Sequence, residues 1–155
     1  MRHLPLLACL ILFSACGPEV VYKDAVTFPE TGWSYADSTT FSYSLDNVDQ
    51  AYDLVLDVNH GIDFPYQNFY VKLHSTFPNG KQQTEQLSHQ LAGDFGVWLG
   101  DCSGDACTLS IPFLQNIRYT LPGEYRLTVE QNSRDEPLAE ALGIGLRVVV
   151  SEAHP

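Results

Sequence analysis

The residues that could carry out catalysis are few in this 155-residue chain, and their spacing argues against a nucleophilic enzyme. The chain contains no Gly-x-Ser-x-Gly sequence, the elbow that presents a serine nucleophile in many hydrolases. His74 and Ser75 are neighbours in a predicted strand, where successive side chains point to opposite faces, so they do not form a nucleophile–base pair. The sequence therefore predicts no catalytic residues and a protein that is not an enzyme.

Candidate metal ligands are scattered along the chain. His60, His74 and His89 show no spacing typical of a metal site, so we predict neither a metal nor a cofactor. Asp57–Asp63 offers an alternative, since oxygen-bearing side chains at alternate positions can wrap a calcium ion. An EF-hand loop has glycine sixth and glutamate twelfth, however, where this chain has isoleucine and asparagine. The other interpretation is that Asn, Gly and Asp simply make a turn.

The beginning of the chain has the parts of a secretory signal. A short positive start is followed by an apolar run from Leu4 to Phe13, interrupted by Pro5. A membrane-spanning helix needs about 20 apolar residues, so this run is too short to be a permanent span. The pattern predicts that residues 1–15 are a cleaved signal peptide.

The residues before Cys16 distinguish two kinds of signal. Phe13-Ser14-Ala15-Cys16 resembles the bacterial lipobox, although a leading leucine is more usual than Phe13. The resemblance implies that Cys16 becomes the first mature residue and carries a diacylglycerol and a further acyl chain such as palmitate. Several acyl chains suffice for stable anchoring, so the mature protein would be held on a membrane without spanning it. The alternative is an ordinary signal followed by an incidental cysteine, which Phe13 disfavours.

Gly17, and not an aspartate, directly follows Cys16. In lipoproteins of enteric bacteria an aspartate at that place indicates retention in the inner membrane, so the outer membrane is expected here, on either its periplasmic or its outer face. Residues 16–27 are predicted to form the lipidated N-terminus and a short tether. Residues 28–152 are predicted to form one domain.

Two further cysteines lie close together. Cys102 and Cys107 are separated by four residues, and an exported compartment is oxidising, so the sequence predicts a disulfide that clips a local loop. A redox pair or a metal site is the alternative, but redox motifs usually have two residues between the cysteines.

Composition limits the partners. The chain has 8 basic and 19 acidic residues, a net charge of −11 that becomes −12 once Arg2 leaves with the signal. Such a surface repels phosphate backbones, so no nucleic acid is predicted as a partner. Basic protein surfaces and bound cations remain compatible with this charge.

The mature chain shows mostly strand patterns. Phe41–Leu45 and Tyr52–Val58 alternate apolar and polar residues, the signature of half-buried strands, and Asn79-Gly80 predicts a hairpin turn. Further strands are predicted at residues 68–74, 82–91, 109–113, 124–130 and 144–150, with a loop at 93–107 and a short helical turn at Leu138–Leu142. The fold class predicted is an all-β antiparallel sandwich of about seven or eight strands.

Trp33 and Trp98 leave a second function open. Together with several tyrosines they could stack on sugars, which would suit a carbohydrate-binding or polysaccharide-handling envelope lipoprotein. The alternative is that both tryptophans pack in the core.

An ordered set of short motifs resembles one family. Phe64-Pro65-Tyr66-Gln67-Asn68-Phe69-Tyr70 is similar to a stretch of the gliding motility lipoprotein GldH family of Bacteroidetes. The other motifs follow in the family's order: Tyr52-x-Leu54-x-Leu56-x-Val58 upstream, then Gly96-x-x-x-Gly100, Gly123-x-Tyr125, Glu130-Gln131-x-x-Arg134, Leu138 and Gly143-Ile144-Gly145-Leu146-Arg147-Val148. The family's frequent arginine near Asn59 is missing, and the Cys102–Cys107 loop departs from the pattern.

The resemblance implies an outer-membrane lipoprotein of the gliding machinery, which is linked to type IX secretion. It implies no catalytic residues. The expected partners are other envelope or gliding-machinery proteins, together with the membrane that Cys16 would enter.

Overall fold

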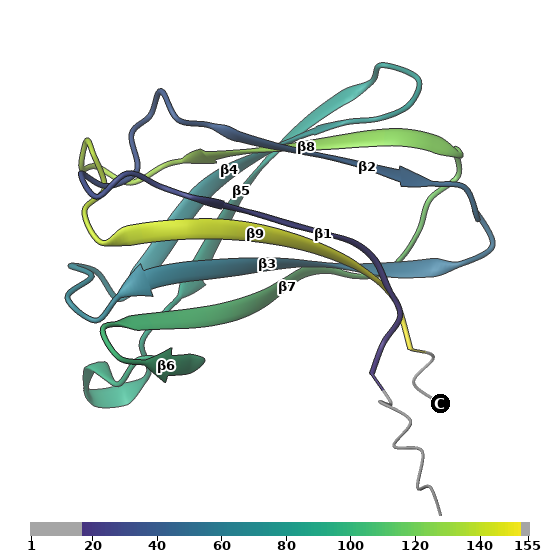
Figure 1. Ribbon diagram of the computed structural model, residues 1–155. Coiled ribbons are helices and arrows are strands. Elements are labelled where there is room, and N and C mark those ends of the chain that lie inside the picture. Colours follow the sequence, from purple (N-terminus) through teal and green to yellow (C-terminus); the bar gives the residue numbers. More distant parts are fainter. Residues whose placement is uncertain (1–16, 153–155) are drawn as a thin grey trace, which may run out of the picture.

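The fold is an all-β sandwich, as the sequence predicts, although it has more strands than expected. The structure is a computed structural model in which residues 17–152 are described. Two antiparallel sheets face each other, one of five strands in the order β1-β9-β3-β7-β6 and one of four in the order β2-β8-β4-β5 (Figure 1). The strands are β1 (Val20–Thr27), β2 (Thr39–Leu45), β3 (Ala51–Gly61), β4 (Asn68–Thr76), β5 (Gln82–Gln90), β6 (Asp101–Ser103), β7 (Ala106–Arg118), β8 (Gly123–Gln131) and β9 (Ala141–Val150), with a 3₁₀ turn η1 (Asp94–Gly96).

The core lies between the sheets and follows from the alternation in the sequence. In β2, every second residue is buried, from Thr39 to Leu45. In β3 the same alternation places Leu54, Leu56 and Val58 inside. Residues on these inner faces belong to one buried cluster, which fixes the register because a one-residue shift would expose all of them.

The predicted tether is largely a strand, which is a correction. Val20–Thr27 forms β1 and pairs antiparallel with β9, from Val20 opposite Val149 to Thr27 opposite Gly143. The main-chain N–H of Val150 also donates to the oxygen of Glu19 at 2.8 Å. This strand is not visible in the residue pattern because it lies at a sheet edge and seven of its eight residues are exposed.

The predicted helical turn at Leu138–Leu142 is wrong. Leu138 forms an isolated bridge with Trp33, and Ala141 already begins β9. The predicted loop at 93–107 is only partly correct, since it contains η1 and β6 and its end belongs to β7. Among residues 17–152, no helix is long and apolar enough to cross a membrane.

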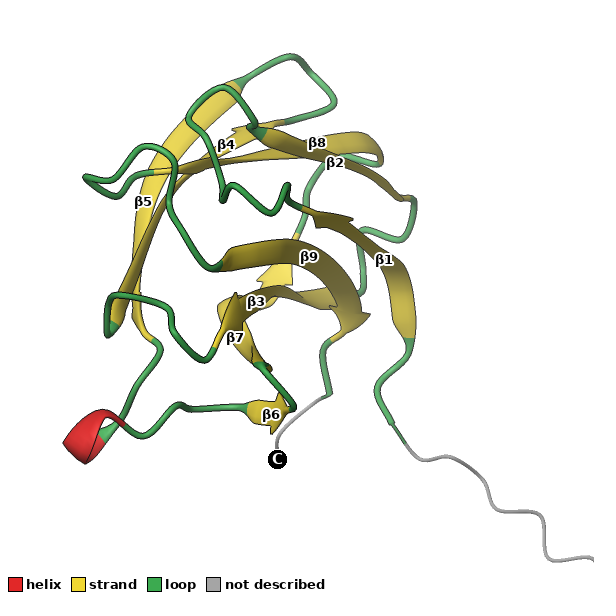
Figure 2. Cartoon of the chain, turned by 60° about the vertical axis from the view of Figure 1, so that its left-hand side comes forward, coloured by secondary structure: helices red, strands yellow, loops and turns green. Residues whose placement is uncertain are grey.

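The sandwich has two distinct ends. At the end that we call the termini end, β1 begins and β9 finishes (Figure 1). The same end carries the β2–β3, β4–β5 and β7–β8 turns. The opposite end, which we call the cleft end, carries the four longer connections, residues 28–38, 62–67, 91–105 and 132–140 (Figure 2).

Candidate functional site: a cleft where the sheets are bridged by loops

A cleft opens at the cleft end where β4 and β8 separate. Their pairing runs as far as Val71 opposite Gln131, and the last bond is the N–H of Asn132 donating to the oxygen of Tyr70 at 2.9 Å. Beyond this bond, the β8–β9 connection crosses to the five-stranded sheet. A cavity of about 520 Å³ opens at this point. The lining residues are Phe64, Tyr66, Asn68, Phe69, Tyr70, Asn132, Ser133, Arg134 and Leu138.

One wall of the cleft is shaped by a buried glutamine. Gln131 is 1% exposed and ends β8. Its amide nitrogen donates to the main-chain oxygen of Asp135 at 3.0 Å, and its amide oxygen accepts from the N–H of Ser133 at 2.9 Å. The hydroxyl of Ser133 also donates to that oxygen. These bonds fold residues 132–135 into a compact turn, because a buried amide must find partners.

A second set of bonds ties this wall to the β1–β2 connection. Glu136 accepts a bond from the Ser34 hydroxyl at 2.6 Å and another from the Tyr35 N–H at 2.8 Å, and these bonds lower the pKa of the Glu136 carboxyl. Trp33 and Leu138 exchange main-chain bonds of 3.0 and 2.8 Å. Two connections that are about 100 residues apart in sequence therefore hold each other.

The chemistry of the cleft suits binding. Tyr66 and Tyr70 are 39% and 41% exposed, and Asn68, Asn132 and Arg134 add polar groups beside them. The Tyr66 hydroxyl donates to the Asp135 carboxylate, and this bond raises the pKa of Tyr66. The lining therefore offers hydrogen-bonding groups and aromatic faces to a ligand.

The exposed aromatic residues gather at this end of the molecule. Four aromatic side chains count as exposed within residues 17–152, and they are Tyr35, Tyr66, Tyr70 and Phe95. All four lie on the cleft-end connections or, for Tyr70, near the start of β4. Aromatic residues are enriched at protein interfaces, so their clustering marks the cleft end as the candidate interaction surface.

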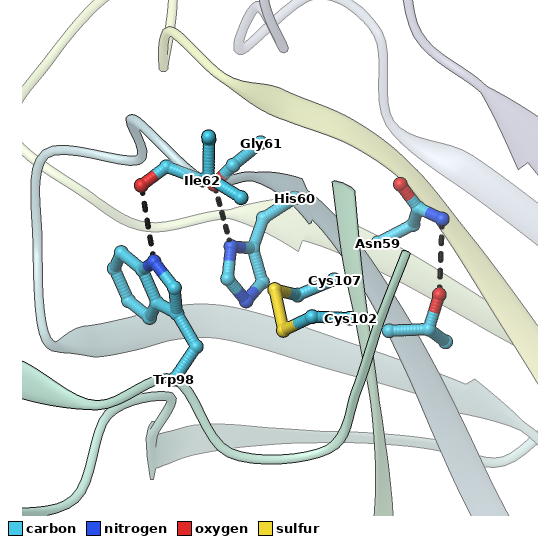
Figure 3. The surroundings of a disulfide bond; sticks show 8 residues. Asn59, His60, Gly61, Ile62, Trp98, Cys102 and Cys107 are labelled. Carbon is cyan, nitrogen blue, oxygen red and sulfur yellow. Dashed lines mark hydrogen bonds between the residues drawn. A yellow bond between two sulfur atoms is a disulfide. The ribbon is translucent and has the colours of Figure 1, made fainter. Parts of the chain in front are cut away.

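The two cysteines lie beside the same end and are joined by a disulfide. Cys102 on β6 faces Cys107 on β7 across the hairpin, with the Cα atoms 4.0 Å apart (Figure 3). The ring of His60 and the indole of Trp98 lie nearby, at 4.7 Å between ring centroids. His60 is fully buried, and its Nδ1 bonds to the oxygen of Gly61 at 2.9 Å.

The segment considered for calcium has a structural role. Asp57 lies within β3 and receives two bonds from Arg147 on β9, at 2.6 and 2.7 Å. The Ser110 hydroxyl donates to the same carboxylate at 2.6 Å, and the Asn59 amide donates to Thr108 at 3.1 Å. The described residues contain no cluster of three His, Cys, Asp or Glu side chains that could hold a metal ion.

The remaining predicted site residues are not brought together. His74 bonds to Glu130 at 3.1 Å and to Thr84 at 3.0 Å on the outer face of the four-stranded sheet. Trp33 is completely buried, so it is not a sugar-stacking platform, and Trp98 is half-buried against Phe64 and His60. Cys16 lies outside the described residues.

Comparison with known proteins decides the family. The family model described as GldH lipoprotein matches residues 20–148, which include all nine strands except the last residues of β9. This chain belongs to the GldH lipoprotein family. A gliding motility lipoprotein GldH homolog of Christiangramia forsetii is 29% identical over 127 residues, covering 81% of this chain and 76% of the relative. The gliding motility lipoprotein GldH of Flavobacterium johnsoniae is 23% identical over 150 residues, covering 92% of each chain.

Among solved structures, a chain of infectious bursal disease virus covers 97% of this chain at 14% identity, with a TM-score of 0.34. A second, the VP2 subviral particle, gives the same TM-score of 0.34. These values are too low to carry a functional argument.

Three of the segments that carry the family resemblance meet at the cleft. Residues 64–70 and the pair Arg134 and Leu138 are distant in sequence, yet both sets line the same cavity. Gln131 belongs to the same segment as Arg134, and its hydrogen bond to Asp135 holds the wall that contains Arg134. The sequence located these motifs but not their convergence, which requires the pairing of β4 with β8. The exposed Phe95 was also missed, because nothing in its neighbours distinguishes it from a core residue.

Proposed function

We propose that this protein is a non-enzymatic component of the gliding machinery linked to type IX secretion, anchored to the outer membrane through an acylated Cys16. In this role the sandwich holds the cleft end toward another envelope protein. The observation that carries the proposal is that three segments of the family resemblance converge on a cleft at the end opposite the start of β1.

The position of Glu19, just before β1, supports this orientation. Glu19 is already bonded to Val150, so only Gly17 and Pro18 separate Cys16 from the sandwich. Fully extended, such a link spans about 10 Å. The 11 residues of β3 extend about 35 Å at the usual rise for a strand, so an anchored protein would hold its cleft well away from the lipid surface.

The content of the cleft supports a binding role. Its lining supplies tyrosine rings, side-chain amides, a serine hydroxyl and one guanidinium. Binding to a protein segment uses these same groups, since aromatic rings and arginine supply most hot spots at interfaces.

The role in the machinery is tested by deletion in the native host. A strain lacking the gene should lose colony spreading, surface display of the gliding adhesin and type IX secretion, and the intact gene should restore them. Normal spreading, display and secretion in the deletion strain would overturn the proposal.

The anchor is tested by fractionation. Cys16→Ala should release the domain from the outer-membrane fraction, while Cys9→Ala, in the predicted signal peptide, should leave it there. A Cys16→Ala protein that stays with the membrane would show that lipidation at this residue does not anchor the domain.

A second candidate function rests on the exposed tyrosines. Tyr66 and Tyr70 present partly exposed rings beside Asn68, Asn132 and Arg134, an arrangement that could stack on sugar rings and bond their hydroxyls. Calorimetry with envelope polysaccharide fragments tests this function. Binding that Tyr66→Ala and Tyr70→Ala abolish would favour it, and no heat with any fragment would remove it.

A further inference from the structure

Phe95 is held in an unfavourable backbone conformation with its ring in solvent. It lies in η1, at the tip of the connection that we call the arm, residues 91–105, which includes β6. Its φ is 60° and its ψ is 18°, the left-handed region that bulky residues rarely occupy. The residue is 104% exposed, so the fold gains no packing from the ring. Strain without structural benefit is a mark of functional positions.

The arm around Phe95 is firmly held. The N–H of Gly93 donates to the oxygen of Val97 at 2.8 Å, and the N–H of Leu99 donates to the oxygen of Leu91 at 2.8 Å. These bonds make the tip a small closed hairpin. A ligand that meets such a tip orders little further chain, which lowers the entropic cost of binding.

The base of the arm is anchored to the sandwich. The indole N–H of Trp98 donates to the oxygen of Ile62 at 3.0 Å, and its ring packs against His60 (Figure 3). The Cys102–Cys107 disulfide closes the next hairpin by joining β6 to β7. The exposed ring of Phe95 is therefore presented from a rigid support.

The tip is apolar and its surroundings are acidic. Val97 and Leu99 are 66% and 40% exposed next to Phe95. The arm carries three aspartates and no lysine or arginine, and within residues 17–152 none of these aspartates forms an ion pair. The aspartates are Asp94, Asp101 and Asp105, all exposed.

This combination selects a partner by its charge. A second copy of this chain would bring another strongly acidic surface, and an anionic lipid surface would repel the aspartates in the same way. A basic rim around an apolar pocket satisfies both the exposed ring and the unpaired carboxylates.

We propose that the arm is a docking element that inserts Phe95 into an apolar pocket, rimmed by lysine or arginine, on a partner protein of the envelope. The inference rests on the proposed function, because it names the kind of surface that the anchored domain would meet. The arm and the cleft share one end of the molecule, so a single partner could cover both.

Crosslinking in intact cells of the native host tests the docking. A photo-crosslinking amino acid at position 97 should give one adduct with an envelope protein, and the same group at position 121, on the termini end, should not. Phe95→Gly should lower the yield at position 97 by at least about 10-fold. The triple change of Asp94, Asp101 and Asp105 to asparagine should weaken it too, and added salt should reproduce that loss.

The mapped crosslink decides the chemistry of the pocket. Partner peptides from an apolar pocket bordered by lysine or arginine would support the proposal. An adduct that is unchanged by Phe95→Gly and by the triple change, or an acidic partner surface, would overturn it.

Stability measurements separate docking from folding. Phe95→Gly should unfold at the same or a higher urea concentration than the parent, because glycine accepts the positive φ. A clear loss of stability would show that the ring serves the fold, and the proposal would be wrong.

Two alternative occupants give distinct results. Phe95-dependent binding of the Cys16→Ala domain to phosphatidylglycerol vesicles would assign the arm to a membrane. Phe95-dependent dimerisation in sedimentation would assign it to a second copy. Either result overturns the docking proposal. A deletion phenotype that Phe95→Gly fully complements would overturn it as well, while leaving the proposed function intact.

Discussion

The side-chain amide of Gln131 donates to the main-chain oxygen of Asp135 at 3.0 Å, and this bond folds the loop that walls the cleft. The amide is buried, so the bond is made away from water, where losing a partner is costly. Gln131 therefore shapes the cleft through the backbone of residues 132–135.

Replacing this glutamine should both destabilise the domain and loosen the cleft. Gln131→Leu leaves the Ser133 N–H and the Asp135 oxygen without their partner, so we expect the free energy of unfolding to fall by about 2–3 kcal/mol. Urea unfolding measures this change. Gln90→Leu, at an exposed position at the end of β5, should change it by less than about 0.5 kcal/mol. Equal stability of the two variants would contradict this account of the loop.

The ion pair between Asp57 and Arg147 should make stability depend on pH. Partial burial raises the pKa of the Asp57 carboxyl, but hydrogen bonds from Arg147 and Ser110 outweigh burial, and the pKa lies below its ordinary value. A depressed pKa in the folded state contributes stability that is full above the unfolded pKa, about 3.9, and is lost as the pH falls through the folded value.

The corresponding experiment compares Asp57→Asn with the parent by urea unfolding. At pH 7 the variant should be less stable by roughly 2 kcal/mol, and the difference should shrink below about pH 4. Asp63→Asn, at an exposed position in the β3–β4 connection, controls for loss of one negative charge. A difference that stays constant from pH 7 to pH 3 would show that the ion pair is not its source.

The disulfide should stabilise the domain modestly. A loop of six residues closed by Cys102 and Cys107 contributes about 2 kcal/mol in the chain-entropy model. The double change to serine should lower the free energy of unfolding by that amount while the far-ultraviolet circular dichroism keeps its β signature. Reduction of the parent protein should give the same shift, and a domain that unfolds outright would mean that the bond holds more than a local hairpin.

Local pattern was enough to predict the strands whose two faces differ. Phe41–Leu45 and Tyr52–Val58 alternate because one face of each strand meets the core, and both lie in strands. β1 escaped prediction because a mostly exposed edge strand has no such alternation. The error at Leu138 has a different cause, since its burial depends on Trp33, which is more than 100 residues away in the chain.

The site was harder to predict than the fold. The resemblance supplied the residues 64–70, 131, 134 and 138, but only the non-consecutive pairing of β4 with β8 places them around one cavity. Phe95 could not be found from the sequence, because exposure and a positive φ are properties of the folded loop. The ion pair of Asp57 could not be predicted either, because its partner Arg147 lies 90 residues away in the sequence.

The central claim is that the anchor holds the termini end to the membrane and the cleft end away from it. Energy transfer from the protein to the bilayer tests this claim most directly. The lipidated protein would be placed in vesicles containing an acceptor lipid, with a donor dye on Val48→Cys at the termini end or on Ala139→Cys at the cleft end. We predict strong transfer from position 48 and weak transfer from position 139, because the two ends are separated by roughly the length of a strand, about 30 Å. Equal transfer from both positions, or stronger transfer from position 139, would contradict the account.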